Sequence, residues 1–146
     1  IHARSRIWPR YTLDLPEIRD LAQYRGCSFM NQETPETGWA LVLPESPRES
    51  LDKSFMEQNQ YLRYLASTLR LPSHLVRRRT LTEALYDMIV GRMVLGQSFQ
   101  NATLDWTWTG PSKSDFVCIY CSESGIRLRH LPRQTRNQAL GLCPNW

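Results

Sequence analysis

The chain has 146 residues, a length typical of one domain with a hydrophobic core of its own. Hydrophobic residues make up 41% of it and charged residues 22%, which excludes an intrinsically disordered chain. The longest apolar stretch, Met88–Leu95, is too short for a membrane span and contains Arg92, so we expect a soluble domain. The formal net charge of +4 favours an anionic partner.

Arginine dominates the basic residues. Only Lys53 and Lys113 are lysines among the 18 basic residues, so sixteen are arginines. The guanidinium fork suits phosphate and carboxylate groups, although a bias in codon composition would produce the same excess. Residues 1–13 and the chain from residue 58 onward are basic, whereas residues 14–57 are acidic. This separation of charge favours association into a homo-oligomer or electrostatic docking on a partner.

The first 13 residues are basic and aromatic without a clear period, which predicts an N-terminal arm before a single domain over residues 14–146. In this arm Trp8 lies among three arginines, Arg4, Arg6 and Arg10. Such an arrangement would suit nucleic acid, because the ring can stack on a base while the arginines hold phosphates.

The next stretch predicts a short helix and a strand. Residues 14–26 have a proline in the first turn and end at Gly26, the pattern of a short helix. Five apolar residues, 39–43, lie between a glycine and a proline and predict a buried strand.

Two longer helices are predicted from capping boxes, in which a serine or threonine precedes a glutamate by three residues. Ser46-Pro-Arg-Glu49 predicts the start of a helix that ends at Pro72. Thr80-Leu-Thr-Glu83 predicts the start of a second helix over residues 81–98. Between them, residues 73–79 predict a short helical turn.

After residue 100 the hydrophobic period changes from helical to alternating. Residues 103–109 and 126–131 alternate, whereas residues 116–121 are apolar on both faces like a central strand. We expect a three-stranded meander whose buried face carries Leu104, Trp106, Trp108, Ile126 and Leu128. The predicted fold class is therefore α+β, with helices in the first two thirds packed on a small C-terminal antiparallel β-meander.

The four cysteines, Cys27, Cys118, Cys121 and Cys143, leave two alternatives open. Cys118 and Cys121 lie three apart in a predicted strand and so face opposite sides, which argues against a shared metal ion or redox pair. We therefore expect no metal and no cofactor. Free thiols would place the chain in the cytoplasm or nucleus, whereas disulfides among the four would indicate secretion. A glycosylation sequon at Asn101 adds weight to secretion.

Sequence motifs lean against an enzyme. A pair of histidines, His74 and His130, could serve as acid and base, but nothing in the local sequence brings them together. The chain contains no glycine-rich phosphate loop, no nucleophile elbow and no His-Glu-x-x-His motif. We assign no catalytic residue.

Arginine clusters favour nucleic acid as the partner, ahead of an acidic protein surface. One cluster is Arg77, Arg78 and Arg79; a second pair, Arg127 and Arg129, alternates on an edge strand and could follow a phosphate backbone. A solvated surface without a ligand would show the same charges. The leading hypothesis is a non-catalytic domain that binds nucleic acid through Arg4, Arg6, Trp8, Arg10, Arg77, Arg78, Arg79, Arg127 and Arg129. The alternative is a secreted, disulfide-bonded protein of the effector or cell-surface-binding kind.

Overall fold

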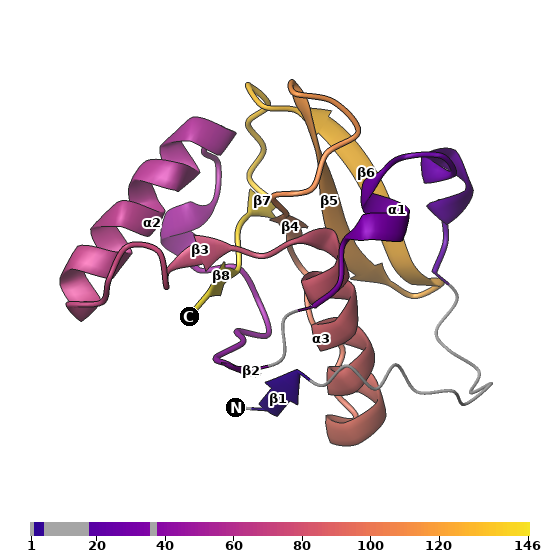
Figure 1. Cartoon of the computed structure of the whole chain (residues 1–146), viewed down its shortest axis with the longest axis horizontal. Helices are drawn as coiled ribbons and strands as arrows, with labels where there is room; N and C mark the ends of the chain where they lie inside the picture. Colours follow the sequence, from indigo (N-terminus) through magenta and orange to yellow (C-terminus); the bar gives the residue numbers. More distant parts are fainter. Residues whose placement is uncertain (1, 5–17, 36–37) are drawn as a thin grey trace.

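The computed structural model describes residues 2–4, 18–35 and 38–146 (Figure 1). The helical elements are η1 (Leu21–Tyr24), α1 (Phe29–Gln32), η2 (Arg48–Ser50), α2 (Phe55–Leu69) and α3 (Leu81–Leu95). The strands are β1 (His2–Arg4), β2 (Gly38–Ala40), β3 (Arg77–Arg78), β4 (Leu104–Trp106), β5 (Asp115–Ser122), β6 (Gly125–Pro132), β7 (Leu140–Gly141) and β8 (Pro144–Asn145). In this part of the chain no helix is long and apolar enough to cross a membrane.

The main sheet has four strands in the order β6-β5-β4-β7. Its centre is the long antiparallel β5–β6 hairpin, in which Asp115 pairs with Pro132 and Ser122 with Gly125. On the other side of β5 lies β4, which runs antiparallel to β5 and parallel to β7. Two short pairs, β1–β2 and β3–β8, stand outside this sheet. The strand β6 is therefore an edge strand.

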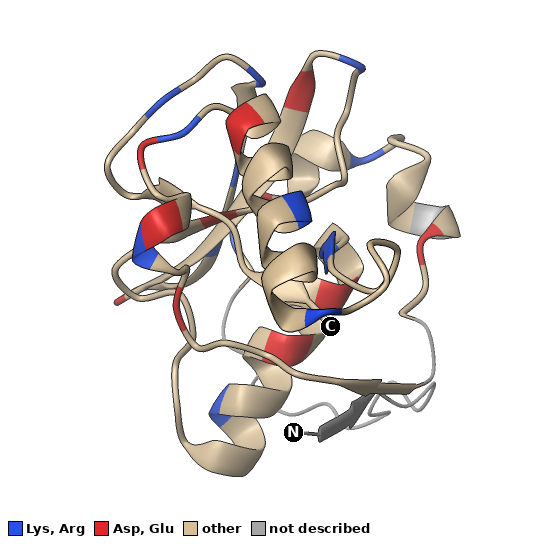
Figure 2. Cartoon of the chain, turned by 90° about the vertical axis from the view of Figure 1, so that its left-hand side faces the viewer, with Lys and Arg blue, Asp and Glu red and all other residues tan. Residues whose placement is uncertain are grey.

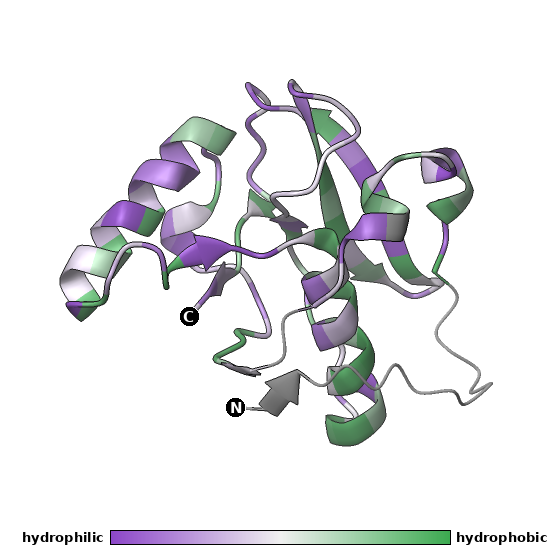
Figure 3. Cartoon of the chain, in the orientation of Figure 1, coloured by the Kyte–Doolittle hydropathy of each residue, from purple (hydrophilic) through white to green (hydrophobic). Residues whose placement is uncertain are grey.

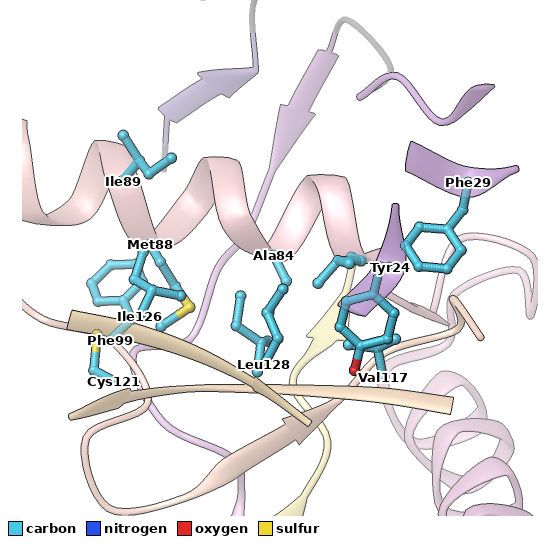
Figure 4. Packing of buried hydrophobic residues seen from close by; sticks show 12 residues of the cluster. Tyr24, Phe29, Ala84, Met88, Ile89, Phe99, Val117, Cys121, Ile126 and Leu128 are labelled. Carbon is cyan, nitrogen blue, oxygen red and sulfur yellow. The ribbon is translucent and has the colours of Figure 1, made fainter. Parts of the chain in front are cut away.

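The sheet buries side chains on both faces. Along β5, Val117, Ile119 and Cys121 join α3 in the largest hydrophobic cluster, which Figure 4 shows between the helix and the sheet. Phe116 and Cys118 alternate with them and join a second cluster around Phe55, at the start of α2. The two long helices thus contact opposite faces of β5.

The predicted fold class is wrong in its arrangement, although the chain contains both helices and strands. Strands are spread through the chain from β1 to β8 and do not form a C-terminal meander on which the helices pack. The predicted buried face also mixes two faces, since Trp106 belongs to the cluster of Phe55 whereas Ile126 and Leu128 belong to the cluster of α3. Alternation within each strand does not reveal which side chains of different strands lie on the same face of the sheet once the strands pair.

Helix α3 begins where the sequence predicts. The Thr80 hydroxyl accepts from the Glu83 N–H and the Glu83 carboxylate accepts from the Thr80 N–H, which completes the capping box. The helix ends three residues earlier than predicted, because Gly96 has the left-handed backbone (φ 64°) that terminates helices. Within it, a Cβ on Gly91 would lie 2.9 Å from the Phe99 ring, so close packing requires glycine there.

Helix α2 begins later than predicted. Ser46-Pro-Arg-Glu49 leads only into the short turn η2, because Asp52 adopts a left-handed backbone (φ 52°) that breaks the helical path. The capping box that starts α2 is formed by Ser54 and Glu57. Figure 3 shows α2 as largely hydrophilic and α3 with long hydrophobic stretches, which agrees with the deeper burial of α3.

Four shorter predictions meet different outcomes. Of the predicted helix 14–26, residues 14–17 lie outside the described residues and residues 21–24 form the turn η1. The predicted strand 39–43 is reduced to β2, and the predicted turn at 73–79 ends in the strand β3. The predicted arm, residues 1–13, is described only at β1, which pairs with β2.

Candidate functional site

The central arginine triplet makes internal contacts. Arg77 donates from both terminal nitrogens to the Glu83 carboxylate at 2.8 and 2.6 Å. Arg79 is 1% exposed and donates to Asp105 at 2.5 Å and to Asp87 at 3.1 Å. Burial alone would lower the pKa of Arg79, but its interactions with Asp105, Cys143 and Asp87 together outweigh burial and raise that pKa above its ordinary value.

Arg78 is equally inaccessible, with 3% of its surface exposed. Its guanidinium donates to the Trp106 carbonyl at 2.7 Å and to the Gln58 side chain at 2.9 Å, and lies 4.0 Å from the centroid of the Phe55 ring. Burial lowers the pKa of Arg78 to about 9, so the group remains a cation at neutral pH. The sequence predicts that these arginines contact phosphates. In the structure their guanidinium groups donate hydrogen bonds to other groups of the same chain and so stabilise the fold.

The N-terminal cluster falls largely outside the described residues. Arg6, Trp8 and Arg10 all lie there, and Arg4 is described only through the backbone of β1.

The remaining predicted pair, Arg127 and Arg129, lines an open hollow of about 420 Å³ on the edge strand β6. This volume lies within the range of small-molecule sites. The hollow is lined by Asp20, Gln23, Tyr120, Arg127, Leu128, Arg129 and His130. Below it is called the β6 hollow.

Strand pairing explains why these side chains meet. Tyr120 of β5 lies opposite Arg127, and Cys118 lies opposite Arg129, so both arginines project from the same face of the sheet. The turn that joins the strands closes at Gly125, whose positive φ of 115° disfavours other residues. The alternation that predicted Arg127 and Arg129 on one face is therefore confirmed.

Asp20 closes one side of the β6 hollow. The Arg19 N–H donates to the Ile126 carbonyl at 3.0 Å, which holds this segment against the edge of β6. The Asp20 carboxylate accepts from Arg127 Nε at 2.8 Å, and this bond lowers the pKa of Asp20 and raises that of Arg127. Both side chains remain about one third exposed, so an anionic ligand could compete with Asp20 for the guanidinium.

Arg129 is the exposed cation of the β6 hollow. Within the described part of the chain, its guanidinium has no hydrogen-bond or ion-pair partner. It therefore offers its donors to a ligand without breaking an existing contact.

His130 adds an exposed imidazole to the lining of the β6 hollow. Its Nδ1 lies 3.3 Å from the Tyr24 hydroxyl, and the two rings meet edge to face. Burial raises the pKa of Tyr24 to about 12, so the hydroxyl keeps its proton at neutral pH and can donate it to Nδ1. The imidazole tautomer decides which of these two atoms donates.

A second exposed feature lies near the other end of the hairpin. The sequence placed Trp108 in the core, but its side chain is 57% exposed. Its ring centroid lies 5.8 Å from that of Phe55 and 6.0 Å from that of Phe116. The strand β4 ends at Trp106, so the alternation that was expected to bury Trp108 stops before it.

All four cysteines are free thiols. Cys118 and Cys121 belong to different clusters on opposite faces of the sheet, as their spacing in a strand predicted. Burial raises the pKa of the thiols of Cys118 and Cys121, and raises that of Cys143 to about 12. The structure thus contains none of the disulfides on which the alternative of a secreted protein rested.

Charges of both signs are interspersed over the molecule. Figure 2 shows acidic and basic segments side by side in the described part of the chain. Among the described residues, no group of three or more His, Cys, Asp or Glu side chains could hold a metal ion.

Comparisons with protein-family models, with curated proteins and with solved structures find no significant match to this chain.

Sequence reasoning missed four members of the β6 hollow: Asp20, Gln23, Tyr120 and His130. Two of them carried a signal, because Tyr120 and His130 lie in the predicted hairpin next to the arginines. Asp20 and Gln23 carried none, since they lie more than 100 residues earlier and reach β6 only through tertiary packing.

Proposed function

We propose that this chain is a non-catalytic domain that binds an anionic partner, nucleic acid, at the β6 hollow. Arg129 and Arg127 hold phosphate oxygens, and Tyr120 offers a ring to a base. His130 and Gln23 supply polar groups for a base or a sugar. An acidic protein surface is the competing partner, and the experiment below separates the two.

One observation carries the proposal: an exposed arginine without a partner among the described residues shares an open hollow with an aromatic ring and several hydrogen-bonding groups. Arginine binds phosphate with two parallel hydrogen bonds, and aromatic rings stack on bases. The buried arginines, Arg78 and Arg79, are left out of the proposed contacts because their donors are occupied inside the fold.

The test is the salt dependence of binding by the Arg129→Gln variant to a labelled oligonucleotide, measured by fluorescence anisotropy. The affinity of the wild-type protein should fall steeply between about 50 and 200 mM salt, because phosphate contacts release counterions. Removal of one contact should weaken binding about tenfold and reduce the slope of log K against log salt by about 0.7 for a single strand.

The matched control is Arg63→Gln, which removes the same charge from the exposed side of α2, away from β6 (Figure 1). It should leave both affinity and slope nearly unchanged. Equal losses of affinity in the two variants would show that only the net charge of the protein matters. An affinity that does not change with salt concentration would overturn the proposal. Binding of a polyglutamate peptide with greater affinity than any oligonucleotide would assign the hollow to an acidic protein.

A further inference from the structure

The exposed tryptophan near the β6 hollow has a rigid support. Phe55 and Phe116 stack with their ring centroids 4.0 Å apart and their planes at 16°. Trp108 rests against both rings, and the Arg78 guanidinium lies over the Phe55 ring. The indole is thus held in place from behind while 57% of it faces solvent. Below, the three aromatic residues are called the Trp108 platform.

The Trp108 platform lies on the face of the sheet from which Tyr120, Arg127 and Arg129 of the β6 hollow project. Cross-strand pairing places Phe116 opposite Leu131, two residues along β6 from Arg129. Two residues of a strand span roughly 7 Å, and the Trp108 ring centroid lies a further 6.0 Å from that of Phe116. Phe116, Tyr120 and Leu131 are partly buried and Arg129 is exposed, so this face is accessible along its β6 edge, whereas Cys118, between Phe116 and Tyr120, is fully buried.

Cations also lie at the platform end of this face. Arg133 follows β6 directly and donates to the Met56 sulfur at 3.5 Å, and its backbone N–H is tied to the Ser114 carbonyl. Lys113 is exposed in the neighbouring turn. An extended polyanion that starts at Arg129 would therefore meet positive charge again beyond Trp108.

We propose, on the basis of the nucleic-acid function argued above, that the ligand is a single strand which runs along this face from Tyr120 to Trp108. Bases in a duplex are stacked on one another and cannot offer their faces to a protein ring, whereas an unpaired base can. The phosphates contact Arg127 and Arg129, and a base stacks on the Trp108 platform.

The test compares a single strand of about ten nucleotides with the same sequence as a blunt duplex. The wild-type protein should prefer the single strand. Trp108→Leu should weaken single-strand binding about 5- to 150-fold, the range for loss of one stacked base, and should leave the salt slope unchanged because no phosphate contact is lost. Trp108→Phe, which keeps an aromatic ring on the platform, should recover much of the affinity.

The matched control is Trp39→Leu, which removes an even more exposed indole (76%) from β2 and should leave binding unchanged. A direct readout is also available, since the single strand should quench tryptophan fluorescence in the wild-type protein and quench it less in Trp108→Phe.

The two proposals fail differently. If Arg129→Gln weakens binding but Trp108→Leu does not, or if the duplex binds as tightly as the single strand, the single-stranded path is wrong and the β6 hollow remains. If neither the single strand nor the duplex binds in a salt-dependent way, both proposals are wrong.

Discussion

A half-buried carboxylate at the end of α1 is held by threonine hydroxyls. The Thr109 hydroxyl donates to the two carboxylate oxygens of Glu33, at 2.7 and 2.8 Å, and Thr82 lies at 3.5 Å. Burial raises the pKa of Glu33, and the hydrogen bond from Thr109 offsets only part of this effect. Glu33 therefore favours its neutral form more in the folded chain than in the unfolded one.

This shift gives a pH dependence with a definite sign. A carboxyl whose pKa is raised by folding contributes stability at low pH that is lost as pH rises through the raised pKa. The window begins near the ordinary value of 4.5. We expect the urea midpoint of Glu33→Gln to fall less than that of the wild-type protein between this pH and neutrality.

The control for this prediction is Glu123→Gln, which changes an exposed carboxyl in the β5–β6 turn. Its urea midpoint should follow the wild-type pH profile. A Glu33→Gln profile that is parallel to the wild-type one would show that Glu33 does not contribute.

At the scale of single elements, both long helices begin at capping boxes, and these should be energetically similar. Ser54→Ala and Thr80→Ala should each lower the free energy of unfolding by about 1 kcal/mol, because each leaves helix N–H groups without their acceptor. Urea denaturation followed by circular dichroism measures the loss. Ser67→Ala, on the exposed side of α2, should leave the free energy of unfolding unchanged. A loss of similar size in this variant would show that the missing caps do not cause the destabilisation.

The helices also show what local sequence can and cannot predict. Thr80 and Glu83 identified the start of α3 because the capping box is a local interaction. The same motif at Ser46 misled, because the backbone reverses at Asp52, whose N–H is tied to the carbonyl of Asn137, 85 residues later in the chain. No local pattern reports such a contact.

The strands follow the same rule. The β5–β6 hairpin was predictable from its alternation and its turn at Gly125. Strands of two residues, such as β3, β7 and β8, are too short to show a period. In the candidate site, the placement of Arg127 and Arg129 on one face was predictable for the same reason, whereas the burial of Arg79 depends on Asp105, which is distant in sequence.

At the scale of the whole molecule, one carboxylate joins distant parts of the chain. Asp105 of β4 accepts from Arg79 through one oxygen and from the Cys143 N–H, at 2.7 Å, through the other. Arg79 in turn contacts Asp87 of α3. The main sheet, the segment before α3, the helix itself and the C-terminal segment therefore meet at a single buried ionic cluster.

Disruption of this cluster should destabilise the entire fold. Asp105→Asn removes the charge that faces Arg79, and loss of one partner of a buried ion pair costs about 3–5 kcal/mol. We expect a fall of this size in the free energy of unfolding, measured by urea denaturation as one cooperative transition. Asp115→Asn, which changes a partly exposed carboxylate beside Ser112, should lower it by less than about 1 kcal/mol. Equal effects would contradict this assignment.

Residues 140–146 have a consequence for how the protein is made. Leu140 and Gly141 complete the main sheet beside β4, and Pro144 and Asn145 pair with β3, some 66 residues earlier in the chain. The Trp146 carbonyl accepts from the Leu41 N–H at 2.8 Å. A nascent chain that lacks this segment has β3 and one side of β4 without their partners, so native structure can be completed only after the ribosome has added residue 146. Contacts of such long range also slow folding, and a newly made chain would expose its strand edges to chaperones for longer.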